Sequence, residues 1–520
     1  MSAINSATSW HRKAILFIAG AFLFRVLYSL FYPVHLAGDE AYYWDWGRRP
    51  ALGYYSKPAM IAWIYALVEW IGGNLFAVRF TAILFGTLSL IMTWLLTRKL
   101  FDARTGFFAV LLALAVPGNC LLNFVLTIDA PLVLAWSLSL WFLWKFATGE
   151  QPGLSLFLLF VCLTAGHLSK QMMLFFPPLA LAFLATGAET RPLLKKPGIW
   201  LALIGSFIGW LPLLYWNSQN GWITFNHMSS HIGAHAEPSL WETLYERVET
   251  FLEFFLSQLG ALSPVIAVLI FMLTVLPFFT KRWNLAPEYR FLIIFCGAPL
   301  LLILVAAFFQ KIQPNWPAVL YLAGIPMVAA WFSKAVDWYP VSDKSRDVLW
   351  RIGLGLGFAL CAFFYFGPVV FALTGNEGNT ADPNRRMIGS GRLGKAVHEI
   401  RQTVPGWEDD FIIASGHRYQ AAWLGFELPD HPEVYRLAGS RIESQYEVWP
   451  GPWEDGKKGQ NAFYVTRGTG TEAGPLVENA FEKVEFIKSI EVKFGSGMMT
   501  YSVFHCTNLR AQLRPDISNH

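Results

Sequence analysis

The sequence has 520 residues, which would usually correspond to about three soluble domains, but 54% of them are hydrophobic, 16% aromatic and only 15% charged. Ordinary globular chains carry about 25% charged residues. This composition excludes a disordered, collagen-like or disulfide-stapled chain, argues against a wholly soluble protein, and indicates a membrane protein.

Charged side chains are unevenly distributed along the chain. Residues 1–375 carry 24 Lys or Arg and 17 Asp or Glu, whereas residues 376–520 carry 16 and 19. The change falls at the polar stretch 374–386, TGNEGNTADPNRR. We therefore expect a membrane domain over 1–375 and a soluble domain over 376–520. The net charge of +4 is a small difference between these parts and gives no reason to expect a nucleic-acid partner.

Apolar runs long enough to cross a hydrocarbon core about 30 Å thick recur through the first part. The first follows HRK at 11–13 and lacks a small-residue cleavage site, so we expect a retained helix and not a signal peptide. Eleven such runs predict a mainly α, polytopic helix bundle, over 14–32, 75–97, 106–124, 130–147, 153–169, 172–187, 199–216, 254–279, 290–309, 316–333 and 350–373.

The basic residues between these runs predict how the chain is oriented. If the N-terminus is cytoplasmic, the inner loops hold sixteen Lys and Arg and the outer loops hold six. Cytoplasmic loops are enriched in Lys and Arg. We therefore expect a multi-pass protein of the cytoplasmic (inner) membrane, with residues 376–520 on the periplasmic or extracellular side.

This orientation gathers the conspicuous acids and bases at the outer face. Charges at membrane depth are costly and usually face a cavity or one another. The pattern predicts a site that opens outward, although a first outer loop (33–74) that merely anchors two helices would explain part of it. The residues concerned are Asp39, Glu40, Asp45, Lys57, Asp129 and Lys170.

Several strings, in order along 14–375, resemble one family of membrane enzymes. They are GDEAYYWDW (38–46), YYSKPAMIAW (54–63), TIDAPLVLAW (127–136), LTAGHLSKQ (163–171), WNSQNGWITF (216–225), FLSQLGALSP (255–264) and QPNWPAVLYLA (313–323). Together they resemble membrane glycosyltransferases of the protein-mannosyltransferase superfamily, with the C-type (GT-C) fold, and are similar to bacterial lipid A aminoarabinose transferases. The likeness continues more weakly through 412–432 and 444–449.

The resemblance implies an inverting transfer of a sugar from a polyprenyl-phosphate donor to a hydroxyl or phosphate of an acceptor at the outer face. The acceptor would be lipid A, another glycolipid, a polysaccharide or a protein. Two alternatives stay open. One is a transporter or flippase of lipid-linked sugars, and the other is a polymerase or ligase of lipid-linked glycans.

The resemblance also assigns roles to individual residues. Asp39 matches the family's first-loop acid and is expected to be the catalytic base, with Glu40 as the second choice. Lys57 and Lys170 match family basic residues expected to bind the donor phosphate. Where this chain has Ser56-Lys57-Pro58-Ala59, close relatives often carry Glu-Lys-Pro-Pro, which leaves the identity of the sugar open. The expected pocket residues are Tyr54, Tyr55, Asp129, His231, Asn315 and Trp316.

Other polar residues allow more than one interpretation. Asp129 is equally suited to capping a helix ahead of Pro131. His227, His231 and His235 recur every four residues, a spacing that would suit a divalent metal on a helix. A pocket-lining or interfacial role is favoured, so no metal or other cofactor is assigned. Arg25 requires a buried partner inside its span, and Arg79 is expected to extend to the membrane interface.

Two glycine motifs and the tail complete the pattern. GSGRLGK (389–395) is not interpreted as a nucleotide loop, because Ala396 replaces the magnesium-binding Ser or Thr of a P-loop. GLGLG (353–357) is interpreted as a site of close helix packing. Strand-like runs at 409–415, 461–467, 482–494 and 498–505, with a helical run at 418–426, predict an α/β domain. It offers His417, Arg418 and Tyr419, for which we expect no role beyond covering the site or guiding the acceptor.

Overall fold

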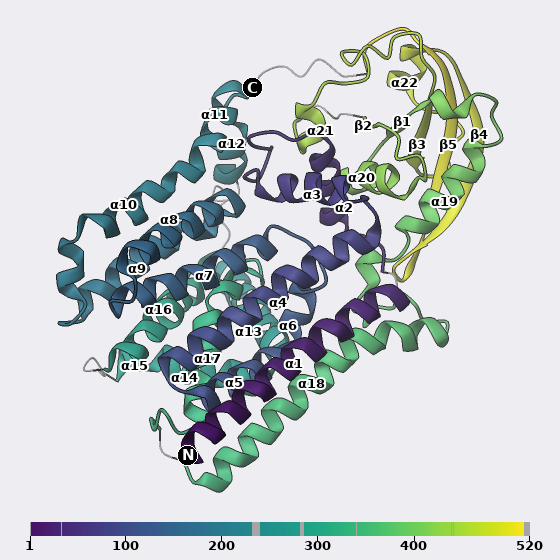
Figure 1. Ribbon diagram of the computed structural model, residues 1–520. Helices are drawn as coiled ribbons and strands as arrows, with labels where there is room; N and C mark the ends of the chain where they lie inside the picture. Colours follow the sequence, from purple (N-terminus) through teal and green to yellow (C-terminus); the bar gives the residue numbers. More distant parts are fainter. Residues whose placement is uncertain are drawn as a thin grey trace. The chain divides into compact units, whose positions relative to one another are not determined.

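The computed structural model describes residues 2–32, 34–230, 240–280, 285–339, 341–437, 439 and 441–513. The chain divides into two compact units, whose elements are labelled in Figure 1. The helical unit comprises Met1–Phe31, Arg79–Pro212 and Gly233–Phe364. The mixed unit comprises Tyr32–Val78, Leu213–Ile232 and Tyr365–His520. The mixed unit therefore combines the segment after the first helix with the polar C-terminal part of the sequence.

Long apolar helices dominate the first 375 residues. Among the described residues, seven helices are long and apolar enough to cross a membrane, or eight if a bent pair is counted as one span. The chain is thus a multi-pass, mainly helical protein, as the sequence predicts. The seven lie in α1 (Ser2–Phe31), α4 (Leu75–Leu100), α7 (Asp129–Ala147), α8 (Pro152–Ser169), the continuous run Pro197–Gln219 formed by α10 (Pro197–Gly205), η3 (Ser206–Trp210) and α11 (Leu211–Gln219), α16 (Pro287–Phe309) and α18 (Asp343–Leu373).

The other four predicted spans form broken or short helices. The run 106–124 divides into α5 (Ala103–Leu114) and α6 (Pro117–Leu122), and 254–279 bends by 109° between α13 (Leu240–Leu262) and α14 (Pro264–Thr274), which α15 (Leu276–Phe279) follows. The run 172–187 starts as the short helix η1 (Gln171–Phe175) before α9 (Phe176–Thr186), and 316–333 starts as η4 (Trp316–Val319) before α17 (Tyr321–Phe332). Proline cannot donate the backbone bond that continues a helix, and Pro117, Pro264 and Pro317 each lie at the first turn of a new segment. The count of eleven spans stays a prediction.

Buried polar contacts hold two arginines of the helical unit, Arg25 and Arg79. Arg25 is buried and donates from Nη1 to Asn123 Oδ1 at 2.7 Å, which supplies the partner that its depth requires. A Cβ on Gly86 would lie 1.9 Å from the same Asn123 oxygen, so only glycine admits that amide. Arg79 donates to the Phe124 carbonyl at 2.8 Å and is buried, so the expectation that it extends to the interface is wrong.

Aromatic and aliphatic side chains fill the core of the helical unit. The Phe176 ring packs 5.1 Å from Trp136 and 4.9 Å from Phe295, which joins α9 to α7 and α16. In α18, a Cβ on Gly357 would lie 2.3 Å from the Ala115 carbonyl oxygen, so this glycine of the GLGLG motif allows close packing at the end of α5. The packing interpretation of that motif is confirmed at Gly357.

The mixed unit is built on a five-stranded sheet (Figure 1). The strands are β1 (Phe411–Ala414), β2 (Val434–Arg436), β3 (Ala462–Arg467), β4 (Phe481–Phe494) and β5 (Gly497–Leu509). Their order is β2-β1-β3-β5-β4, with β1 parallel to β2 and β3, and β5 antiparallel to β3 and β4. The predicted strands and the α/β character of the tail are confirmed. The three-residue strand β2 was not predicted, because it is too short to show a pattern.

Helices of the mixed unit come from distant parts of the sequence. They are α2 (Gly38–Arg48), α3 (Met60–Trp70), α12 (Ile223–Ser230), α19 (Ser390–Arg401), α20 (Arg418–Glu427), α21 (Gln445–Val448) and α22 (Pro475–Ala480). Helix α20 packs on both α2 and α19. Helix α19 contains the GSGRLGK motif, and a Cβ on Gly391 or Gly394 would lie 2.2 Å from His35 or 2.5 Å from Glu427. These two glycines therefore allow close packing of α19.

Candidate functional site

Helix α2 carries the three acids of the GDEAYYWDW string in three different environments. Asp39 lies in its first turn, and its side chain is 48% exposed. Glu40 and Asp45 are buried. The three carboxylates therefore differ in access to a substrate, although they lie within one helix of eleven residues.

Asp39 is held by two residues at the start of α20. The Tyr419 hydroxyl donates to Asp39 Oδ1 at 2.9 Å, and Arg418 Nη2 lies 3.8 Å from the same oxygen. Burial and the Asp39 carboxylate raise the pKa of Tyr419 to about 12, so the hydroxyl stays protonated and can donate. A Cβ on Gly38 would lie 2.3 Å from Tyr419 Cγ, so glycine is required for this approach. Asp39 is thus oriented while about half of its side chain stays exposed.

The two buried acids of α2 accept hydrogen bonds that hold the structure together. Glu40 Oε2 accepts from the Ala37 backbone N–H at 3.0 Å, which satisfies a donor at the start of the helix. Asp45 Oδ2 accepts from the Tyr446 hydroxyl at 2.7 Å. Burial raises the pKa of Asp45, with Arg48 acting in the opposite direction. Glu40, named as the second choice for the base, is enclosed in the helix cap.

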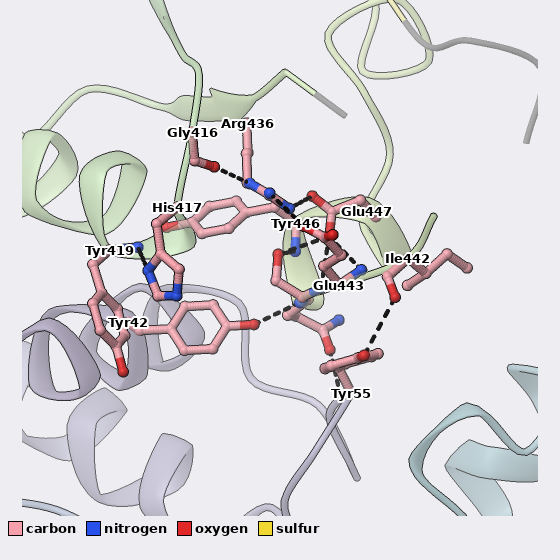
Figure 2. A network of polar contacts seen from close by, with 12 residues as sticks. Tyr42, Tyr55, Gly416, His417, Tyr419, Arg436, Ile442, Glu443, Tyr446 and Glu447 are labelled. Carbon is pink, nitrogen blue, oxygen red and sulfur yellow. Dashed lines mark hydrogen bonds and ion pairs between the residues drawn. The ribbon is translucent and has the colours of Figure 1, made fainter. Parts of the chain in front are cut away.

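Figure 2 shows the polar network beside α2, which joins it to α21. The Gln445 backbone N–H donates to the Tyr42 hydroxyl at 2.5 Å, and the Gln445 side chain accepts from the Tyr55 N–H at 2.7 Å. Arg436 donates to Glu447 at 2.5 Å and to Glu443 at 2.8 Å, and its Nε donates to the Gly416 carbonyl at 2.7 Å. This network fixes the loop that precedes Lys57.

The loop carrying the predicted residues Tyr54, Tyr55 and Lys57 is tightly folded. Tyr54 is fully buried, stacks on Trp46 at 4.3 Å, and its N–H donates to the Lys57 carbonyl at 3.2 Å. The Tyr55 hydroxyl lies 3.0 Å from His227 Nδ1. Lys57 itself is partly exposed. Tyr54 therefore shapes the loop from inside, whereas Lys57 reaches its surface.

In the helical unit, three predicted residues from separate strings meet. Lys170 Nζ donates to Asp129 Oδ1 at 2.7 Å, and Asn315 Nδ2 donates to Asp129 Oδ2 at 2.7 Å. Asp129 is the first residue of α7, and Ile128 occupies the capping position, so the alternative role of Asp129 as a side-chain N-cap is wrong. Within the described residues, Lys170 uses one of its three N–H donors, so it can offer the others to an anion.

The neighbouring string 313–323 is anchored to the string 255–264. Gln258 Nε2 donates to the Pro314 carbonyl at 3.1 Å, and Gln258 Oε1 accepts from the Tyr321 hydroxyl at 2.7 Å. These bonds hold the turn that presents Asn315. Trp316 follows it and is exposed.

The predicted histidine triplet is only partly described. His227 lies in α12 and contacts Tyr55, whereas His231 and His235 lie outside the described residues. Within the described part of the chain, no group of three or more His, Cys, Asp or Glu is arranged to hold a metal.

Comparison with known proteins extends these observations. Residues 56–216 match the family model described as Dolichyl-phosphate-mannose-protein mannosyltransferase. The structure of ArnT from Cupriavidus metallidurans bound to undecaprenyl phosphate is similar over 98% of this chain and 99% of that chain, with a TM-score of 0.59 and 15% sequence identity. ArnT in the apo state gives a TM-score of 0.57 over 96% and 98% of the two chains, at 15% identity.

The chain has the GT-C fold. The predicted fold class, a membrane helix bundle with a C-terminal α/β domain, is confirmed, and so is the resemblance to the protein-mannosyltransferase superfamily. A curated relative, the lipid A galacturonosyltransferase RgtD of Rhizobium johnstonii, is 25% identical over 330 residues. That alignment spans 62% of this chain and 65% of the relative.

Sequence reasoning overlooked several residues in and around α2, the helix that carries Asp39. Tyr42, Gln445 and Tyr446 were not singled out, and Arg418 and Tyr419 were noted without a chemical role. The adjacent tyrosines of GDEAYYWDW and the weaker likeness over 412–432 were the available signals. Tyr419 lies 380 positions from Asp39, and no local pattern links residues that far apart.

Proposed function

We propose that this chain is an inverting glycosyltransferase that moves a sugar from a polyprenyl-phosphate donor to an oxygen of an acceptor. The proposal is supported by the match over residues 56–216 and by likeness to a lipid A galacturonosyltransferase. An ArnT structure with undecaprenyl phosphate shares the fold. Because the named relative modifies lipid A, a hydroxyl or phosphate of lipid A is the first acceptor to test.

The observation that carries the proposal is the exposure of Asp39. Of the three acids in α2, Glu40 and Asp45 are buried, whereas the Asp39 side chain is 48% exposed and oriented by Tyr419. A base must reach the proton that it removes. In the proposed reaction Asp39 accepts the acceptor O–H proton as that oxygen attacks the anomeric carbon, and the bond from that carbon to the phosphate oxygen breaks.

The departing polyprenyl phosphate carries the negative charge that develops in this step. A cation held next to the leaving oxygen stabilises that charge. We propose Lys57 and Lys170, the basic residues that the family resemblance assigns to this role, as ligands of the donor phosphate. For Lys170, the support is that its Nζ is fixed by Asp129 and retains unused donors among the described residues.

The same proposal includes the location of the protein. Lys and Arg are concentrated in loops on one side of the predicted spans, which favours a cytoplasmic N-terminus in the inner membrane. A membrane domain over 1–375 with its first outer loop at 33–74, and a periplasmic domain over 376–520, follow from that orientation. Donor and acceptor would meet at the outer face.

The test is transfer by the purified protein in detergent. It is incubated with lipid A and radiolabelled undecaprenyl-phosphate galacturonic acid, aminoarabinose or mannose, and the products are identified by mass spectrometry. With one of these three donors, we expect labelled lipid A that carries one added sugar. A protein reconstituted in vesicles that moves labelled donor across the bilayer, but labels neither lipid A nor a glycan or protein acceptor, would instead be a transporter.

A further inference from the structure

Arg418, the first residue of α20, presents a guanidinium group beside Asp39. Its guanidinium carbon lies 5.4 Å from the Tyr42 ring and 4.9 Å from the Tyr419 ring. The side chain is 32% exposed. Arg418 is therefore in contact with two aromatic rings while about a third of its side chain is exposed.

The hydrogen-bonding capacity of Arg418 is largely unused. Nη2 donates to the Tyr419 hydroxyl at 3.4 Å, close to the limit for a hydrogen bond, and lies 3.8 Å from Asp39 Oδ1. Nε is buried and has no partner within the described residues. A guanidinium carries five N–H donors, and leaving buried donors unpaired is costly. The described contacts of Arg418 thus leave room for a ligand.

Arg436, an arginine of the same unit, has a structural role and can be compared with Arg418. Arg436 donates to Glu443, Glu447 and the Gly416 carbonyl, so all three of its nitrogens have partners (Figure 2). Among the described residues, Arg418 has no comparable set of partners. A half-exposed ion pair 3.8 Å long contributes little to stability, so pairing with Asp39 does not account for Arg418.

The position of Arg418 in its helix makes the charge harder to explain by folding alone. The N-terminus of a helix carries partial positive charge, so a cation in the first turn is unfavourable. Arg418 is the first residue of a ten-residue helix. A bound anion would remove this repulsion and satisfy the planar donor fork, for which phosphate oxygens are suitable acceptors.

We propose that Arg418 binds a phosphate oxygen of a substrate next to Asp39. This assignment rests on the proposed function, in which Asp39 activates the acceptor oxygen. The phosphate has two possible sources, the donor polyprenyl phosphate and a phosphate group of the acceptor. In either case Arg418 brings a phosphorylated substrate within reach of the base.

The first arm of the test measures donor binding. Undecaprenyl phosphate and neutral undecaprenol are titrated by intrinsic fluorescence into wild-type protein and into Arg418→Gln, Arg418→Lys and the control Arg510→Gln. Arg510 is an exposed arginine paired with Glu482. If Arg418 binds the donor phosphate, Arg418→Gln weakens undecaprenyl phosphate binding by about tenfold to a hundredfold. Undecaprenol binding and the Arg510→Gln control stay unchanged.

The second arm measures acceptor binding with bisphosphorylated and dephosphorylated lipid A. If the phosphate belongs to the acceptor, Arg418→Gln weakens binding of the phosphorylated form by about the same factor and leaves the dephosphorylated form unchanged. Arg418→Lys keeps a positive charge but lacks the planar set of guanidinium donors, so its affinity for the phosphorylated ligand should fall by less. Should Arg418→Gln fail to elute as a folded species, Arg418→Lys must still weaken one phosphorylated ligand.

Unchanged affinity for both phosphorylated ligands in folded Arg418 variants would overturn the assignment. Both arms measure binding and not turnover. A wild-type protein that transfers no sugar would therefore count against the proposed function alone, while the role of Arg418 would still be decided by the affinities.

Discussion

Replacing Asp129 with Asn should destabilise the protein through Lys170. The side chains of Lys170 and Asp129 are only 10% and 6% exposed, and they are joined at 2.7 Å. Asn keeps the size of the side chain but removes its charge, which leaves a buried ammonium without its described counter-ion. Removing one partner of a buried pair costs about 3–5 kcal/mol. Because Asn retains one acceptor for Lys170, we expect the lower end, about 3 kcal/mol.

A double-mutant cycle measures this contribution. Unfolding in mixed detergent micelles is followed for wild type, Asp129→Asn, Lys170→Met and the double variant. Lys170→Met leaves a buried carboxylate and should also cost about 3 kcal/mol, whereas replacing a whole buried pair by less polar residues is often nearly neutral. The double variant should therefore lose far less than the sum of the two single variants, a coupling of more than about 3 kcal/mol. Lys311→Met is the control, because Lys311 pairs with Glu253 at side-chain exposures of 70% and 61%. It should change stability by less than about 1 kcal/mol.

The result that refutes this reasoning is specific. If Asp129→Asn is no more destabilising than Lys311→Met, the Lys170 ammonium is not held by Asp129 in a buried site. If the losses of the two single variants simply add in the double variant, the two side chains do not interact.

Three further predictions concern α2. Gly38→Ala places a Cβ 2.3 Å from Tyr419 Cγ, so it should cost about 1–3 kcal/mol in thermal unfolding; an unchanged melting temperature would contradict the close approach. Glu40→Gln keeps an acceptor for the helix cap, so it should lower stability by less than about 1 kcal/mol and leave transfer activity within about twofold of wild type. A large loss of activity in folded Glu40→Gln protein would instead make Glu40 the base. Burial raises the pKa of Asp45, so the folded state holds this proton to a higher pH than the unfolded chain does. The free energy of unfolding should therefore fall as the pH rises from the ordinary pKa of Asp through this raised value. Asp45→Asn should flatten that slope when denaturation is measured across pH.

Hydropathy identified the membrane helices but not their interruptions. Seven of the eleven predicted runs contain helices of spanning length among the described residues. At 254–279 the chain instead bends by 109°, around Ser263, whose φ is +71°. A proline after a helix-like stretch is compatible with either a kink or a new helix. Composition alone cannot choose between them, because both bury the same apolar residues.

The candidate site was predictable where its residues lie in one string and not where they meet across the chain. Asp39, Lys57, Asp129, Lys170 and Asn315 were named from short strings. The contacts of Asp129 with Lys170 and Asn315 span 41 and 186 positions. Such pairings are decided by how helices pack, which local patterns do not encode. The string GDEAYYWDW alone also does not show that Glu40 is buried whereas Asp39 is exposed.

The most direct test of the proposed activity is sugar transfer by Asp39→Asn, compared with wild type and Glu40→Gln. The rate of label transfer from the active undecaprenyl-phosphate sugar to lipid A is measured in protein shown to be folded and to bind undecaprenyl phosphate. We predict that Asp39→Asn reduces the rate by about a hundredfold or more, because the base is lost, while Glu40→Gln stays close to wild type. Transfer by Asp39→Asn at a rate near that of wild type would contradict the account.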